Sequence, residues 1–404
     1  MNPTLELFDV CIIGASISGN YLAFLLSDSN LKILLIEEHS EIGKPLQCAG
    51  IVSRKLESLV NLKDHLILNR VNVAKIISPE GNEIYLSGDE QPFIIDRINF
   101  DYYFFEQIKR NPNINIVLNE KFKSFNLIEE EEGQLVLVET NKRTIKSKLL
   151  VGCDGPLSRV ARQCGIINKI IYATQIRTTT SFDPNTAELY FDERWNDLFG
   201  WLVPENSKTA RIGLATSDGI SNKFKAFLKK LDIKKEDIID RQGGIIPIGM
   251  MNECAFDNTL LLGDAACQVK ATTGGGIVML LIAAKFAAGC IKSSFKEENF
   301  SKSFIYKNYE KQCLYTIGKQ LKFHFLLRIF FQNCTSDDFE SLFQLIRKHK
   351  LQKLISLYGD MDFPRKMLIR LFFNAQIVRF LIKFVFQHPK FLISLVPNLK
   401  SIIL

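Results

Sequence analysis

The first 38 residues constrain the fold more than any other part of the chain, because two apolar runs flank a glycine turn and a helical stretch. Residues 8–14, FDVCIIG, form a short apolar run that ends in glycine. Residues 32–38, KILLIEE, form a second run that ends in acids, and the segment between the runs, SGNYLAFLLSDSN, has helical character. A strand, a tight turn, a helix and a second strand make a βαβ unit, so we expect an α/β fold.

The turn of this unit, GASISG at 14–19, follows the pattern G-x-G-x-x-G except that Ser16 stands at the middle glycine. Gly14 permits the tight turn and Gly19 lets the helix pack closely on the strand, with Ser18 between them. The free N–H groups of the helix start favour a pyrophosphate. Glu37 ends the second strand, where a carboxylate can accept hydrogen bonds from both ribose hydroxyls. A chance pair of glycines is the alternative, but the flanking strands and Glu37 favour a dinucleotide site.

Two later segments each place an aspartate directly after an apolar strand. Residues 149–162, LLVGCDGPLSRVAR, carry Asp154, and residues 258–277, NTLLLGDAACQVKATTGGGI, carry Asp264. The second segment opens a long apolar helix whose N–H groups suit the O2/N1 edge of a flavin ring, where they would stabilise the reduced ring. That helix start comprises Gly275, Gly276 and Ile277. A strand-terminating turn explains either segment alone, but both together in this order favour a flavin dinucleotide.

In order, the three segments resemble the dinucleotide turn, the D-G motif and the G-D motif of FAD-dependent oxidoreductases of the aromatic-hydroxylase type. Residues 94–108, IIDRINFDYYFFEQI, resemble the R-x-x-F-D segment of the same family, which implies that Arg97 contacts FAD. The resemblance implies FAD as the cofactor. It also implies a Rossmann-like FAD-binding domain of that type, an antiparallel-sheet substrate domain and a helical C-terminal region.

The flavin motifs recur on both sides of strand-rich insertions, so we expect a discontinuous FAD-binding domain. Its expected segments are 1–75, 97–165 and 258–300. The substrate domain is expected at 76–96 and 166–257, and a helical, basic region at 301–404.

Two segments indicate one branch of this superfamily. Residues 37–53, EEHSEIGKPLQCAGIVS, resemble a stretch of the geranylgeranyl reductases, which implies that Cys48 lies beside the flavin ring and that Ala49 and Ile51 line the same pocket. Residues 199–204, FGWLVP, resemble the Y-x-W-x-F-P motif of that family. This implies substrate contacts by Phe199, Trp201 and Pro204, although Phe199 lacks the tyrosine hydroxyl. The alternatives are a small buried hydrophobe at Cys48 and a core aromatic at Trp201.

Reduction of an isoprenoid double bond sets chemical requirements that the resemblance must meet. The alkene has no electron-withdrawing neighbour, so hydride cannot add to it without a proton. The site therefore needs a reduced flavin, an apolar tunnel and one acid. Cys48 is the proton-bearing side chain that the motif places near the ring, and a thiol with its ordinary pKa of about 8.5 is protonated at neutral pH. Water or the reduced flavin are the alternative acids.

The C-terminal quarter carries the positive excess of the chain. Residues 301–404 contain 17 Lys and Arg against 6 Asp and Glu, whereas the whole chain contains 51 against 44. Within it, residues 366–387 predict one helix with a narrow polar stripe on an apolar surface. The stripe comprises Lys366, Arg370, Gln376, Arg379, Lys383 and Gln387. We expect this helix either to lie in an anionic membrane interface or to pack in a helical domain with its stripe toward solvent.

The partners and the compartment follow from the same features. We expect a prenyl lipid as substrate, and ferredoxin, reduced deazaflavin and NAD(P)H all remain open as the electron donor. Basic residues interleaved with Phe and Leu argue against nucleic acid. Nine scattered cysteines without a CxxC pair argue against a metal site and for a reducing compartment. The longest apolar stretch, 271–284, contains three glycines and argues against a spanning helix. We therefore expect a cytoplasmic protein, with the inner face of the cell membrane as a candidate peripheral location.

Three other functions remain open at this point. The first is a flavin monooxygenase or halogenase on the same fold. The second is a quinone-linked electron carrier, which the cysteine spacings do not favour. The third is a flavin-loaded protein of the membrane surface that turns over no prenyl substrate.

Overall fold

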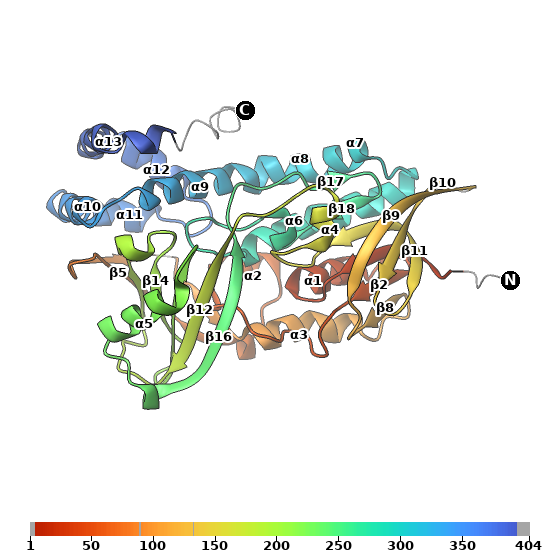
Figure 1. The fold of residues 1–404 in the computed structure, drawn as a ribbon, viewed down its shortest axis with the longest axis horizontal. Helices are drawn as coiled ribbons and strands as arrows, with labels where there is room; N and C mark the ends of the chain where they lie inside the picture. The colour runs from red at the N-terminus through yellow and green to blue at the C-terminus, as the bar shows by residue number, and fades with distance from the viewer. Residues whose placement is uncertain (1–4, 89, 132, 394–404) are drawn as a thin grey trace.

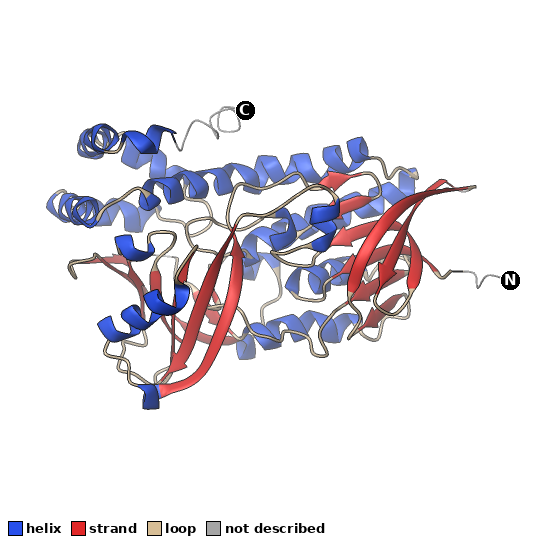
Figure 2. Ribbon diagram, viewed as in Figure 1, coloured by secondary structure: helices blue, strands red, loops and turns tan. Residues whose placement is uncertain are grey.

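The computed structural model describes residues 5–88, 90–131 and 133–393. Within these ranges it contains an eight-stranded sheet, a seven-stranded sheet and a small three-stranded sheet. The two large sheets lie at opposite ends of the molecule, at the right and the lower left of Figure 1. Figure 2 shows that helices cover both and form a layer along the top of the view. The mixed α/β fold that the sequence predicts is thus confirmed.

The eight-stranded sheet is built on parallel central strands. Its order is β17-β18-β11-β1-β2-β8, and β1 pairs in parallel with β11 on one side and β2 on the other. Strands β9 and β10 extend it as an antiparallel ribbon from β11. The strand bounds are β1 Leu7–Ile13, β2 Ile33–Ile36, β8 Ile114–Val117, β9 Phe122–Glu130, β10 Gly133–Thr140, β11 Thr144–Gly152, β17 Ala255–Phe256 and β18 Thr259–Leu261. The parallel strands have continuous apolar sequences because both of their faces are buried.

The turn between β1 and α1 (Ile17–Leu26) depends on two glycines. Gly14 has a φ of +99°, which favours glycine, and a β-carbon there would lie 2.4 Å from the carbonyl oxygen of Cys153. A β-carbon on Gly19 would lie only 2.0 Å from the carbonyl oxygen of Gly14. The helix can therefore approach the strand this closely only because both side chains are absent.

The seven-stranded sheet separates a packed core from a cavity. Its order is β16-β12-β15-β14-β13-β5-β6. The bounds are β5 Val73–Ile77, β6 Glu83–Ser87, β12 Ile170–Thr178, β13 Thr186–Tyr190, β14 Gly200–Pro204, β15 Ala210–Thr216 and β16 Ile238–Pro247. One face packs on α5 (Ile220–Lys230) through Phe224 and Phe227. Strand β5 begins just before residue 76, the expected start of the substrate domain.

The three-stranded sheet and the remaining helices complete the fold. The order β3-β7-β4 joins Ile51–Val52, Phe93–Ile95 and Ile67–Arg70. Helices α1, α3 and α6 pack together beside the eight-stranded sheet. The helix bounds are α2 Leu56–Leu59, α3 Arg97–Ile108, α4 Arg159–Gln163, α6 Ile277–Glu297, α7 Lys302–Ile305, α8 Lys311–Cys313, α9 Lys319–Gln332, α10 Ser336–Lys348, α11 Leu351–Tyr358, α12 Arg365–Phe372 and α13 Ala375–Gln387. Helices α10–α13 lie over the seven-stranded sheet in Figure 1.

The prediction of one helix over 366–387 is wrong, because this stretch forms two helices, α12 and α13. Asn374 separates them. Its side-chain oxygen accepts hydrogen bonds from the N–H groups of Gln376 and Ile377, at 3.0 and 3.3 Å. An asparagine in this position favours a new helix start over continuation of the preceding helix.

Helix α6 is the one described helix that is long and apolar enough to cross a membrane. Two thirds of its most apolar window is buried inside the protein, where α6 packs against α1 and against the helical segments that follow it in the chain. Its apolar character is therefore accounted for by the core of the FAD-binding end.

Substitution of Gly19 by alanine tests the close approach of helix and strand. We expect Gly19→Ala to lower the free energy of unfolding by about 1–3 kcal/mol, because the new methyl group overpacks the turn. Gly289 is the matched control: it lies exposed in α6, and a β-carbon there would meet no atom within 4 Å. Gly289→Ala should raise stability by about 0.5–1 kcal/mol. Chemical denaturation measures both, and a Gly19→Ala protein as stable as the wild type would contradict the account.

Candidate active site

The nucleotide end of the site surrounds the first turn. Glu37 follows β2, and its carboxylate accepts hydrogen bonds from the N–H groups of Ala15 at 2.8 Å and His39 at 2.9 Å. These bonds hold the turn and the second strand together. The ring Nδ1 of His39 also contacts the oxygen that accepts from the His39 N–H, at 2.6 Å, so the oxygen facing Ala15 is the one that can accept a further bond from a ribose hydroxyl. Ser18 is buried against Gly263 of the later G-D segment.

Arg97 begins α3 and points into the same region. Its guanidinium lies 2.9 Å from a carboxylate oxygen of Asp101, and that carboxylate accepts a hydrogen bond from Ser16 Oγ, also at 2.9 Å. Burial lowers the pKa of Arg97, but Asp101 and then Cys48 raise it by more, so the guanidinium stays charged. Its Nε–H is buried and has no hydrogen-bond partner among the described residues. A buried donor without a partner is available to a bound group.

Asp264 lies close to Arg97, at the start of a short turn after β18. Burial raises the pKa of its carboxyl from 3.8 to about 6, with Arg97 opposing the shift. One carboxylate oxygen would lie 3.5 Å from a β-carbon on Gly276, so it faces the start of α6. Within the described residues no hydrogen bond reaches this carboxylate. It is therefore an open acceptor for the hydroxyl groups of a ligand.

Asp154 has a structural role in addition to its predicted contact with a nucleotide. Its carboxylate accepts hydrogen bonds from Ser158 Oγ at 2.5 Å and from the N–H groups of Arg159 and Val160 at 2.7 and 3.2 Å. The side chain is therefore occupied in capping α4. Its backbone packs against Gly14, so Asp154 contributes to the shape of the turn, and its direct contact with a nucleotide stays a prediction.

The segment 272–276 leads into α6, and no side chain among the described residues caps the helix start at Gly276. His324 of α9 supports this segment. Its Nε2 lies 3.2 Å from the carbonyl oxygen of Asp362, which can only accept, so Nε2 carries the proton and Nδ1 accepts from the Thr272 hydroxyl at 2.6 Å. Burial, and then Lys270, lower the pKa of His324 to about 4, so the ring is neutral at pH 7.

The segment 47–51 is held from the other side by the seven-stranded sheet. Gln175 of β12 donates to the carbonyl oxygen of Cys48 at 3.0 Å, and Arg211 of β15 donates to that of Ala49 at 2.7 Å. The Cys48 thiol accepts from the N–H of Gly50 at 3.3 Å. Arg211 is only 3% exposed and pairs with the equally buried Glu205 at 2.6 Å. These bonds fix the position of the thiol relative to Arg97.

A cavity of about 800 Å³ joins both segments to the apolar face of the seven-stranded sheet. Residues 47–51 and 272–275 line it, and so do Phe199 and Trp201. Helices α9–α13 close it from above, opposite the sheet. The wall is predominantly apolar, as a site for a hydrocarbon chain requires.

Successive side chains of β14 point to opposite faces of the sheet, and this determines which residues of 199–204 reach the cavity. Phe199, Trp201 and Val203 lie on the cavity face, whereas Leu202 packs in the core on the α5 side. Pro204 lies two residues after Leu202, so its side chain is on the same face of the strand as that of Leu202, away from the cavity. It is absent from the cavity wall, and we therefore assign it no substrate contact. The motif points to Val203 instead.

Sequence reasoning missed several residues of the wall. Gln175 and His324 are isolated polar residues in their elements, and no local motif marks them. The apolar residues of α9–α13 read as ordinary core positions. Their spacing in the sequence indicates helices, but it does not indicate which sheet these helices face.

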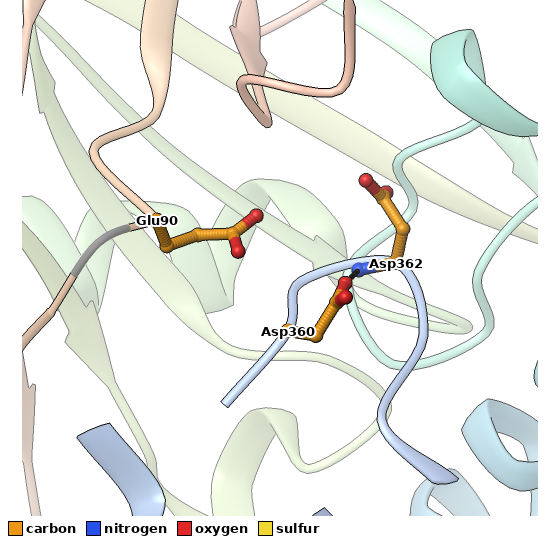
Figure 3. Close-up of side chains that lie close together, drawn as sticks. All are labelled: Glu90, Asp360 and Asp362. Carbon is orange, nitrogen blue, oxygen red and sulfur yellow. Dashed lines mark hydrogen bonds between the residues drawn. The ribbon is translucent and has the colours of Figure 1, made fainter. Parts of the chain in front are cut away.

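A group of three carboxylates lies at one edge of the cavity, and Figure 3 shows how Glu90 approaches the loop that carries Asp360 and Asp362. Lysines neutralise this group: Lys55 lies 2.8 Å from Asp360, and Lys270 lies 2.6 Å from Asp362. These ion pairs tie α12 and its preceding loop to the FAD-binding end. The group is therefore explained as an ion-pair cluster, and we assign no metal to it.

A family model for an FAD binding domain matches residues 7–211, about half of the chain. The chain therefore belongs to this family, and the protein is a flavin-dependent oxidoreductase with FAD as its cofactor and a fold of the aromatic-hydroxylase type. The site fits this cofactor on two observations made above. Among the described residues neither the Arg97 Nε–H nor the Asp264 carboxylate has a hydrogen-bond partner, so they offer a buried donor and an acceptor.

Individual relatives have low sequence identity to this chain but align with most of it. An uncharacterised protein of Methanocaldococcus jannaschii is 28% identical over 378 residues, covering 88% of this chain and 92% of the relative. The digeranylgeranylglycerophospholipid reductase of Methanosarcina acetivorans is 25% identical over 373 residues, covering 86% and 91%. A crystal structure of a geranylgeranyl bacteriochlorophyll reductase-like protein from Thermoplasma acidophilum matches with a TM-score of 0.79 and 20% identity, covering 96% of this chain and 99% of that chain. This last likeness shows the fold.

The raised pKa of Asp264 predicts opposite effects of Asp264→Asn on FAD binding and on stability. The folded state holds the proton more tightly than the unfolded state, so this contribution to stability is complete below pH 3.8 and is lost as pH rises through about 6. At pH 8 the FAD-free variant should be more stable than the FAD-free wild type, by about 1–3 kcal/mol. The difference should shrink toward pH 4.

The same variant should retain FAD less well, because it loses a charge-assisted hydrogen bond worth about 1.5–3 kcal/mol. Thermal denaturation of the FAD-free proteins across pH and fluorescence titration with FAD provide the two measurements. A variant that is less stable than the wild type at pH 8, with unchanged FAD affinity, would refute the assignment.

Proposed function

We propose that the protein reduces isoprenoid double bonds in geranylgeranyl chains, and that its substrate is a precursor of an archaeal-type membrane lipid. The observation that carries this proposal is the cavity, because a single apolar wall runs from the flavin-site segments 47–51 and 272–275 to the C-terminal helices. A flavin enzyme for small polar substrates would not need an apolar cavity on the order of 800 Å³. The reductase names of the relatives support the same substrate class.

The residues of the chain meet the requirements of this reaction. FAD, when bound and reduced, supplies hydride-transfer chemistry. Cys48 lies on the cavity wall, where an alkene would lie, and the bonds from Gln175 and Arg211 keep its segment in place. The apolar faces of β14 and α9 exclude water, which protects a developing tertiary cation from capture.

Three other titratable groups on the wall, His324, Glu90 and Asp360, are less suited to donate a proton, and Asp360 pairs with Lys55 at 2.8 Å. His324 is neutral at pH 7 and already uses its single N–H toward Asp362. Glu90 has a pKa raised by burial, but it belongs to the ion-pair cluster beside Lys55. Cys48 is therefore our candidate for the catalytic acid, with water as the alternative source.

An anaerobic experiment tests the function directly. The FAD-loaded protein is reduced with dithionite, which replaces the unknown electron donor, and mixed with digeranylgeranylglyceryl phosphate. Mass spectrometry should show a gain of two hydrogens for each reduced double bond, whereas the fully saturated lipid should remain unchanged. No hydrogen gain with reduced FAD in place would contradict the proposal. Peroxide release from NAD(P)H in air would favour a monooxygenase instead.

Substitution of Cys48 by serine tests its role as the acid. Serine is nearly isosteric but is a much weaker acid, so we expect unchanged fold and FAD content with slower reoxidation of the reduced protein by the prenyl lipid. A tenfold loss of rate corresponds to about 1.4 kcal/mol of transition-state stabilisation. Reduction by dithionite should be unchanged, since it needs no proton on an alkene. Equal reoxidation rates in variant and wild type would assign Cys48 to the cavity wall alone.

A further inference from the structure

The outer face of α13 combines exposed apolar and basic side chains. Four of them recur at helical spacing: Arg379, Ile382, Lys383 and Phe386. Phe386 is 82% exposed, although phenylalanine is normally buried. The opposite face of the helix packs inward through Ile377 and Phe384. This helix is therefore apolar on both faces, and only its outer face also carries charge.

The outer face of α12 has the same character. Lys366, Ile369, Arg370 and Phe373 are exposed at helical spacing, and Phe373 is 83% exposed. We call the outer faces of the two helices the α12–α13 surface, defined by these four residues and the four of α13. Phe373 and Phe386 thus each share a helix face with basic residues, and the two helices contact each other.

The charge of this part of the chain has one sign. After Asp362 the sequence contains no Asp or Glu, but it contains seven Lys or Arg. No acidic side chain from the same helices therefore neutralises the α12–α13 surface, and an anionic partner complements it.

The inner faces of α12 and α13 line the cavity described above. Met367, Leu371 and Phe380 belong to its wall. Phe372 also lines the cavity and is nevertheless 63% exposed, so the cavity opens to the outside at this residue. The mouth of the cavity and the α12–α13 surface therefore coincide.

We propose that the α12–α13 surface docks on an anionic lipid bilayer, and that the prenyl chain enters the cavity from this bilayer beside Phe372. Phe373 and Phe386 would insert among the acyl chains, while the basic side chains extend to the phosphate groups. A substrate that enters in this way exchanges one apolar environment for another and need not cross water. The entry route rests on the proposed function, whereas the docking does not.

An acidic electron-carrier protein would also complement the charge, but two observations favour the bilayer. The exposed apolar side chains alternate with the basic ones along both helices instead of forming a separate patch. In addition, the cavity that opens here suits a hydrocarbon chain, which the bilayer holds and a soluble carrier does not.

Vesicle sedimentation tests the docking without any turnover. The FAD-loaded protein is mixed with vesicles of phosphatidylglycerol or of phosphatidylcholine at about 0.1 M salt. We expect binding to phosphatidylglycerol to be at least about 30-fold tighter, since each basic residue near an anionic surface contributes on the order of a fivefold gain. Arg379→Glu with Lys383→Glu should abolish this preference.

The chain offers matched controls for both kinds of residue. Lys225 and Lys229 lie at the same helical spacing on the exposed face of α5, so their double reversal to glutamate has the same change in charge. Ile167 is 80% exposed outside the α12–α13 surface. Phe373→Ser with Phe386→Ser should weaken vesicle binding at least about tenfold, whereas Ile167→Ser should not.

Insertion is measured by tryptophan fluorescence. Trp195 and Trp201 are both buried, so a tryptophan introduced as Phe386→Trp reports on the surface. Lipids brominated in the acyl chain should quench this variant strongly and an Ile167→Trp variant weakly. Equal quenching of the two variants, or equal loss of binding in the α5 and α13 charge reversals, would overturn the proposal.

Two further outcomes separate the proposals from each other. Tight vesicle binding by a protein that reduces no prenyl lipid would leave the docking intact and refute the proposed function. Loss of electron transfer from an acidic protein donor in the Arg379→Glu, Lys383→Glu variant, with vesicle binding unchanged, would replace the bilayer by a protein partner.

Discussion

The bonds that hold segment 47–53 between the two large sheets determine how the cofactor site meets the cavity. Arg211 reaches the Ala49 carbonyl from a buried ion pair with Glu205, and Ser53 donates to Asp362, which pairs with Lys270. Removing one partner of such a pair leaves an uncompensated buried charge, so these bonds are costly to break. Three parts of the chain, the sheet, the flavin segment and the C-terminal helices, are thereby fixed around Cys48.

Two residues at the FAD-binding end lower the stability of the protein without its cofactor. Asp264 lies in surroundings that raise its pKa to about 6, and the buried Nε–H of Arg97 has no partner in the part of the chain that the structure describes. Each arrangement costs free energy in the protein alone, because buried polar groups favour partners. A dinucleotide bound to both groups would remove both costs, and the fold of this region and the binding of FAD would then be energetically linked.

The parts predictable from sequence were those that local patterns encode. Gly14 and Gly19 follow from the geometry of one turn, and the ordered motifs around Asp264 and Cys48 led to the flavin and the reductase branch. At Asp154 a helix cap and a ligand contact use the same residue type after a strand, so the sequence pattern does not separate the two roles. Asn374, a residue type that favours a helix start, indicated that the stretch 366–387 is two helices. The continuous apolar periodicity of this stretch nevertheless led to the prediction of one helix. The closure of the cavity by α9–α13 depends on long-range packing, which no short pattern contains.

A crystal structure of the protein with FAD and a saturated geranylgeranyl-type lipid tests the central claim most directly, that cofactor site and cavity form one site. The account predicts the isoalloxazine ring between Cys48 and the start of α6, with the lipid chain along Trp201 and its polar end toward Phe372. A chain bound outside this cavity, or a flavin ring remote from Cys48, would contradict it.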